Sequence, residues 1–138
     1  MSYNVYILRA PYAEAPKNCS YEQAYNHFKR QIVNFPQPHF LRGGTYVVVG
    51  TNEAYLNITY NYAHYFARFL GGNGLRDFEG KSVAETLPKL MTAVMRMPGE
   101  PDEDYWAPTE GNARHALAQL ITLALMSPEA TKGYWHVD

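Results

Sequence analysis

Leu56-Asn57-Ile58-Thr59-Tyr60-Asn61-Tyr62 is the stretch of sequence that decides the fold. It predicts a strand, Ala54 to Tyr60, that passes directly into a helix, because apolar and polar residues first alternate and aromatic residues then recur at helical spacing. The even-numbered residues of this strand form an apolar face, whereas Tyr55, Asn57 and Thr59 form a polar one. A polar face on a core strand indicates either a solvent-exposed sheet surface or the floor of a binding pocket.

Strands are predicted on both sides of this stretch. A β-branched run precedes it and is expected to form an antiparallel hairpin with it, across a turn at 50–53. Alternation near the N-terminus and an aromatic segment near the C-terminus indicate two further strands. The predicted strands are Tyr3 to Leu8, Thr45 to Val49, Ala54 to Tyr60 and a short one within Gly133 to Val137.

Capping residues mark where the helices begin. Ser20 and Ser82 open capping boxes, and Asn61 and Thr109 are expected to act as single N-caps. Pro88 is expected to kink or restart the third helix. The predicted helices run from Ser20 to about Val33, where Pro36 and Pro38 end the helix, from Asn61 to Gly71-Gly72, from Ser82 to about Met97, and from Thr109 to Met126.

The order of these elements predicts an α+β fold. Strands cluster early and helices cluster late, which favours a small antiparallel sheet with helices packed on one face. A chain of 138 residues is the length of a single domain. We therefore expect one α+β domain over residues 1–138.

Composition excludes several classes of protein. The formal net charge is −1, with both signs mixed, which argues against a nucleic-acid-binding face. No apolar run approaches the roughly 20 residues of a membrane span, and the N-terminus lacks the form of a signal peptide. The single cysteine, Cys19, suits a reducing compartment. We expect a cytoplasmic protein that binds neither nucleic acid nor membrane.

The helix from Thr109 to Met126 is apolar over much of its circumference. Such a helix is either central to the core or part of a subunit interface. The sequence also holds 12 tyrosines, a residue that suits pockets and interfaces. Together these features predict a homo-oligomer, most simply a symmetric dimer.

Four strings of the sequence resemble a group of small phage and prophage proteins. The resemblance covers about residues 40 to 128, and it implies a phage origin and a setting inside the bacterial host cell. It implies no particular reaction. The strings are Arg42-Gly43-Gly44-Thr45-Tyr46, Leu56 to Tyr62, Gly74-Leu75-Arg76-Asp77 and Tyr105 to Ala113.

Recognisable motifs for catalysis or metal binding do not occur in the sequence. Cys19 has no histidine at a known catalytic spacing, and no two of the five histidines stand four residues apart. The acidic segment Pro98 to Asp104 lacks the glycine and distant glutamate of a calcium loop. We therefore expect neither a cofactor nor a metal ion.

The candidate ligand-binding residues combine three kinds of group. Amides and hydroxyls can read polar edges, aromatic rings can stack on a base, and guanidinium groups can bind phosphate. The predicted ligand-binding residues are Arg42, Tyr46, Asn57, Thr59, Asn61, Tyr62, Arg76 and Trp106.

Three functions are compatible with these residues. The first is a phage protein that binds and sequesters a nucleotide-derived host immune signal of the cyclic or ADP-ribose type. The second is a protein–protein interaction module, such as a host-enzyme inhibitor or a virion accessory protein, with exposed tyrosine and tryptophan as anchors. The third and least favoured is a nucleotide hydrolase, in which Asp77 or Glu110 acts with His115.

Overall fold

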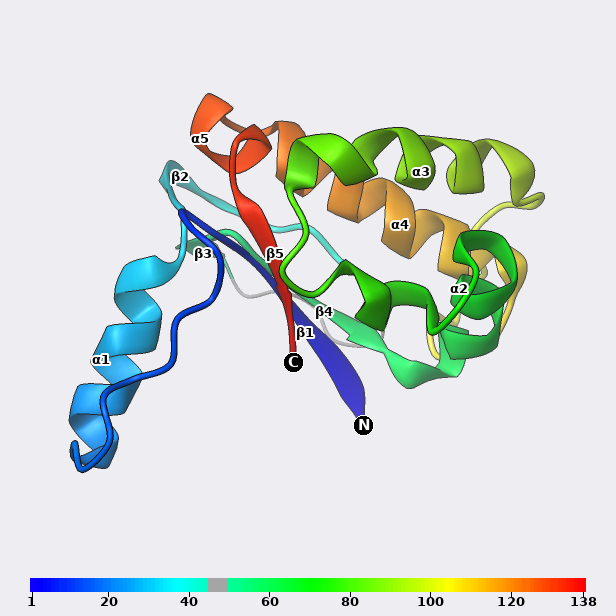
Figure 1. Cartoon of the computed structure of the whole chain (residues 1–138). Helices are drawn as coiled ribbons and strands as arrows, with labels where there is room; N and C mark the ends of the chain where they lie inside the picture. The colour runs from blue at the N-terminus through cyan, green and yellow to red at the C-terminus, as the bar shows by residue number, and fades with distance from the viewer. Residues whose placement is uncertain (45–49) are drawn as a thin grey trace.

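A three-stranded antiparallel sheet in the order β4-β1-β5 forms the centre of the fold, and a two-stranded ribbon, β2-β3, continues beside it (Figure 1). The computed structural model describes residues 1–44 and 50–138, so the strand expected at 45–49 lies outside the described residues. The strands are β1 (Ser2–Leu8), β2 (Asn34–His39), β3 (Thr51–Glu53), β4 (Tyr55–Thr59) and β5 (Tyr134–Val137). The helices are α1 (Tyr21–Gln31), α2 (Ala63–Leu70), α3 (Val83–Arg96), α4 (Glu110–Leu125) and α5 (Pro128–Thr131), with short 3-10 helices η1 (Tyr60–Tyr62) and η2 (Gly74–Phe78). The predicted α+β domain with an antiparallel sheet is confirmed.

The strand β1 is central because it has a partner on each side. Asn4 pairs with Asn57 of β4, and Tyr6 pairs with His136 of β5. The outer edge of β5 is also covered, since Trp135 exchanges backbone hydrogen bonds with Gly80 and Lys81. This pairing removes an open edge that could recruit another chain.

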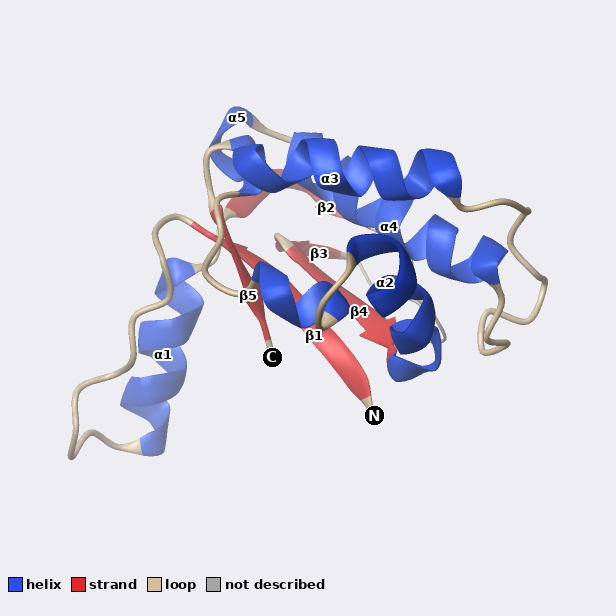
Figure 2. Cartoon of the chain, turned by 45° about the vertical axis from the view of Figure 1, so that its right-hand side comes forward, coloured by secondary structure: helices blue, strands red, loops and turns tan. Residues whose placement is uncertain are grey.

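The helices α2, α3 and α4 lie on one side of the sheet (Figure 2). They cover its apolar face, where alternate residues of the strands are buried, and α4 lies against both α3 and β4. Trp135 on β5 is fully buried, and its indole Nε1 donates to Thr86 Oγ1 of α3 at 2.7 Å. Most apolar residues of α4 are thus buried inside the chain, as expected of a central core helix, whereas Leu125 at its end is exposed. No described helix is long and apolar enough to cross a membrane.

Two predictions about strands are wrong. Residues 51–53, expected in a turn, form β3, and Asn34–His39 forms β2 although it contains Pro36 and Pro38. Proline lacks the amide that a central strand needs, but it is tolerated at an edge, and among the described strands β2 pairs only with β3. The described partner of β4 is β1, and the expected hairpin partner lies outside the described residues.

The helix boundaries follow the capping residues with two exceptions. Ser20 forms the complete predicted capping box with Gln23. At Ser82 only one of the two bonds of the predicted box with Glu85 is present, and Thr109 caps through one bond. Asn61 is not a cap, because Thr59 Oγ1 accepts from the amide of Asn61 and the helix begins as η1. Helix α3 continues through Pro88 without restarting.

Helix α1 projects from the rest of the molecule (Figure 1). None of its residues is buried. Phe28 attaches it to the outer face of the sheet, with its ring centroid 4.9 Å from that of Tyr6 and 5.5 Å from that of His136. Lys29 adds an ion pair with Glu53 at 2.5 Å. The two ring contacts of Phe28, this ion pair and the hydrogen bonds that Gln31 makes with Arg9 and Ala13 together attach α1.

Candidate functional site

Asn57 lies on the polar face of the sheet, on the side away from α2, α3 and α4. Its Nδ2 donates to Ser2 Oγ at 2.7 Å and to Asn4 Oδ1 at 3.0 Å. The hydroxyl of Tyr55 donates to the same Asn4 oxygen at 2.8 Å. These polar groups are partners of one another across β1 and β4, so they do not require a ligand for their hydrogen bonds.

The other polar residues of the 56–62 stretch hold a loop in place. Thr59 is buried and caps η1. Asn61 Nδ2 donates to the carbonyl of Trp106 at 2.7 Å, and the hydroxyl of the buried Tyr62 donates to the carbonyl of Tyr105. Burial raises the pKa of Tyr62 to about 12, against the opposing charge of Arg42. The side chains of Asn61 and Tyr62 therefore bond to the backbone of the loop that joins α3 to α4.

This 98–108 loop is also attached to the first turn of α4. Asn112 is fully buried, and its Nδ2 donates to the carbonyls of Asp104 at 3.0 Å and Ala107 at 2.9 Å. Its Oδ1 accepts from the amide of Asp102 at 2.8 Å. Gly111 allows the close approach, because a Cβ there would lie 1.9 Å from the carbonyl oxygen of Glu100. The chain thus presents a preformed loop rather than a loose connection.

Arg42 packs on the same loop. Its guanidinium carbon lies 4.2 Å from the centroid of the Tyr105 ring, and its Nε donates to the carbonyl of Gly44 at 2.7 Å. His115 also contacts Tyr105, with ring centroids 5.4 Å apart. Burial and the Arg42 charge lower the pKa of His115, and its buried Nδ1 has no hydrogen-bond partner among the described residues. Four predicted residues, Arg42, Asn61, Tyr62 and Trp106, thus meet at the 98–108 loop.

The remaining predicted residues lie elsewhere. Arg76 donates to the hydroxyl of Tyr60, and its guanidinium lies 5.4 Å from the ring centroids of both Tyr60 and Tyr3. Tyr46 lies outside the described residues. Asn57 lies on the outer face of the sheet. The described residues of the predicted ligand-binding set therefore do not form one site.

The acid–base residues of the hydrolase hypothesis are not brought together by a described contact. Asp77 Oδ2 accepts from the amide of Asn73 at 2.9 Å, and Glu110 pairs with Arg68 at 3.4 Å. Within residues 1–44 and 50–138, no carboxylate is hydrogen-bonded to His115.

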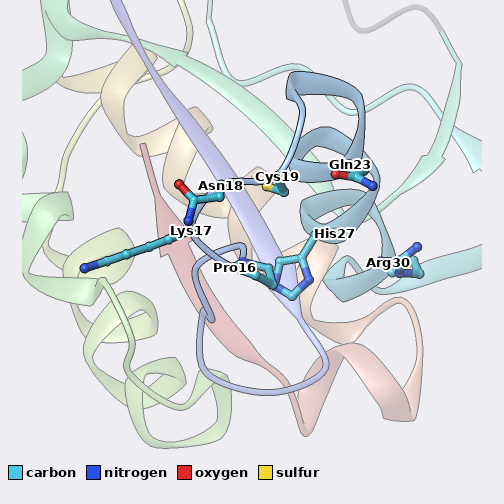
Figure 3. A pocket seen from close by; sticks show the side chains of 7 residues that line it. All are labelled: Pro16, Lys17, Asn18, Cys19, Gln23, His27 and Arg30. Atoms are coloured by element: carbon cyan, nitrogen blue, oxygen red, sulfur yellow. The ribbon is translucent and has the colours of Figure 1, made fainter.

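A groove of about 410 Å³ lies between α1 and the loop that precedes it (Figure 3). We call it the α1 groove. None of the eight predicted residues lines it. Its lining residues are Pro16, Lys17, Asn18, Cys19, Gln23, His27 and Arg30.

Local structure fixes both walls of the α1 groove. Gln23, His27 and Arg30 recur at positions i, i+4 and i+7, which places them on one face of α1. The opposite wall turns at Asn18, whose φ of 67° is left-handed. His27 Nε2 is hydrogen-bonded to the carbonyl of Ala13 at 3.2 Å, which holds the loop against the helix. The spacing of these three residues was the signal in the sequence that could have identified the groove.

The α1 groove is cationic. Lys17 and Arg30 line it, and neither has a carboxylate partner among the described residues. Its lining contains no aspartate or glutamate. Neutral donors accompany the two cations, since an amide nitrogen is present in Asn18 and Gln23. Such a lining suits an anionic ligand, and phosphate above all.

No family model matches the chain, and neither does any curated protein or solved structure. What this groove binds is therefore inferred from its own chemistry.

Proposed function

We propose that this protein binds a phosphorylated small molecule of the nucleotide class in the α1 groove and releases it chemically unchanged. One observation carries the proposal: Lys17 and Arg30 share a groove whose lining holds no carboxylate. A guanidinium can form two parallel hydrogen bonds to a phosphate, and an ammonium adds a point charge. The volume of about 410 Å³ lies within the range of small-molecule sites.

The phage resemblance supports a narrower form of the proposal. A phage protein inside a bacterial cell gains from removing a nucleotide-derived host immune signal, of the cyclic or ADP-ribose type, from the cytoplasm. Binding alone is sufficient for that task. The composition of the groove favours binding over turnover, because its cysteine and histidine are not accompanied by an acidic residue that could orient the histidine.

Calorimetric titration with cyclic dinucleotides and ADP-ribose at low salt tests the proposal. Lys17→Ala or Arg30→Ala should weaken binding by about tenfold or more, the loss expected for one charge-assisted hydrogen bond. Lys89→Ala and Arg96→Ala are matched controls, because these cations are exposed on α3 outside the groove. Mass spectrometry should recover the nucleotide unchanged.

Two results would contradict the proposal. One is that no nucleotide of the panel binds to the unaltered protein. The other is equal affinity in the groove variants and in the α3 controls. If Asn57→Ala or Arg76→Ala weakens binding while Lys17→Ala does not, the ligand lies at residues predicted from the sequence and the α1 groove is not its site.

A protein–protein interaction module is the second candidate, and Trp106 favours it. This residue is 52% exposed, although the side chains of Asn61 and Asn112 fix the backbone of its loop. Exposed aromatic residues on a rigid backbone are typical of interface anchors. In this case Trp106→Ala would abolish capture of a host protein and leave nucleotide binding unchanged.

A further inference from the structure

Two surfaces of opposite charge lie at opposite ends of the molecule. Helix α1, which forms one wall of the cationic groove, is at one end, and the 98–108 loop, between α3 and α4, is at the other (Figures 1 and 2). The loop exposes four carboxylates, which belong to Glu100, Asp102, Glu103 and Asp104. None of these four forms an ion pair with a described residue. Their separation prevents the two surfaces from meeting within one copy.

The loop is preorganised for binding. Asn112 and Tyr62 bond to its backbone, so little conformational freedom remains to be lost when it docks. Trp106 adds an exposed aromatic side chain next to the carboxylates. The opposite surface is accessible in turn, because α1 projects from the body and buries none of its residues.

We infer that the α1 groove of one copy takes the acidic 98–108 loop of a second copy. Charge complementarity identifies this occupant, since unpaired cations and unpaired carboxylates are both present on the same chain. A net charge of −1 leaves little overall repulsion between copies. Each copy offers one groove and one loop, so two copies that lie antiparallel form two reciprocal contacts, and these close a symmetric dimer.

This inference rests on the proposed function in one respect: the acidic loop of the second copy would regulate ligand binding in the same groove. The carboxylates of the second copy take the place of the ligand's phosphate. A phosphorylated ligand and the dimer are therefore mutually exclusive, and ligand binding releases the acidic loop.

A charge-swap experiment tests the interface. The loop variant carries Glu100→Lys and Glu103→Lys, whose carboxylates make no described hydrogen bond. The groove variant carries Lys17→Glu and Arg30→Glu. Sedimentation velocity should show dimers of the unaltered protein that weaken as salt is added. Each variant alone should associate at least about tenfold more weakly, because like charges then face each other.

Two combinations should restore association. In an equimolar mixture of the two variants, both contacts of the heterodimer are again complementary. A chain that carries all four substitutions should likewise form homodimers. Monomers of the unaltered protein at every concentration would overturn the inference, and so would a mixture that associates no better than the separate variants. If the loop variant and the groove variant both still form dimers, the interface lies on another surface and the inference is wrong.

A binding measurement on the loop variant distinguishes the proposed ligand site from the proposed dimer, because that variant keeps an intact groove. The probes are pyrophosphate and ADP-ribose. If either probe binds to the loop variant and the unaltered protein is monomeric, the dimer is refuted and the groove is supported as an anion site. If the charge swap restores association but neither probe and no cyclic dinucleotide binds, the dimer is supported and the proposed function is refuted. Circular dichroism should give the same helix content in all variants.

Discussion

Replacement of Asn112 by alanine should destabilise the protein substantially. The side chain is fully buried and makes three hydrogen bonds to the backbone of the 98–108 loop. A hydrogen bond of this kind contributes about 1 kcal/mol net, so three contribute about 3 kcal/mol. Water can reach part of this exposed loop and offset some of the loss. We expect a decrease of about 2–3 kcal/mol in the free energy of unfolding, or roughly 6–10 °C in Tm for a domain of this size.

Urea denaturation followed by circular dichroism measures this change, and hydrogen exchange locates it. Exchange should accelerate at the amide of Asp102 before it accelerates in the sheet. Asn73→Ala is a matched control, because the side chain of Asn73 is exposed and makes no described hydrogen bond. It should change the free energy of unfolding by less than about 0.5 kcal/mol.

Asn112→Asp separates hydrogen bonding from shape. Aspartate has nearly the same size and can still accept from the amide of Asp102. However, its carboxylate faces the carbonyls of Asp104 and Ala107 without a donor for either. We expect a loss at neutral pH at least as large as that of the alanine variant. Free energies of unfolding within about 0.5 kcal/mol of the unaltered protein for both variants would refute this account of the loop.

Three further predictions follow from single contacts. Gly111→Ala should expose the 98–108 loop to protease and cost about 1–3 kcal/mol by overpacking; unchanged cleavage would contradict this. Phe28→Ala should speed hydrogen exchange along α1 without affecting the sheet, and equal exchange in both would argue against its anchoring role. Because the pKa of His115 is lowered in the fold, the unfolded chain gains its proton first, near pH 6.5. Stability from this group is complete above that pH and falls below it, so His115→Gln should flatten the acid limb of the stability profile.

The sequence predicted the elements whose signals are local. Capping side chains and apolar periodicity gave the ends of α1, α3 and α4 closely, because a cap acts within its own first turn. Strand β2 was missed because Pro36 and Pro38 are read as helix and strand breakers, whereas an edge position tolerates them. Asn61 shows a similar limit: its residue type fits a cap, but a tertiary contact with Trp106 takes its side chain.

The candidate site was less accessible to prediction. The choice of Asn57 assumed a polar face in need of a partner, but Ser2 and Asn4 on the neighbouring strand supply that partner. Strand pairing is a tertiary interaction, and the sequence of one strand does not show which strand will pair with it. The α1 groove depends in the same way on where the 16–19 loop folds relative to α1. Only the spacing of Gln23, His27 and Arg30 was present in the sequence.

The central position of β1 has a consequence for the order of folding during synthesis. This strand is synthesised before its partners Tyr55–Thr59 and Tyr134–Val137, which follow about 50 and about 130 residues later. Such long sequence separations slow folding, because large loops must close before the sheet gains its contacts. The apolar side chains of Val5 and Ile7 stay uncovered until then. During synthesis, a short apolar segment of the chain is therefore accessible to a chaperone until both partner strands have formed.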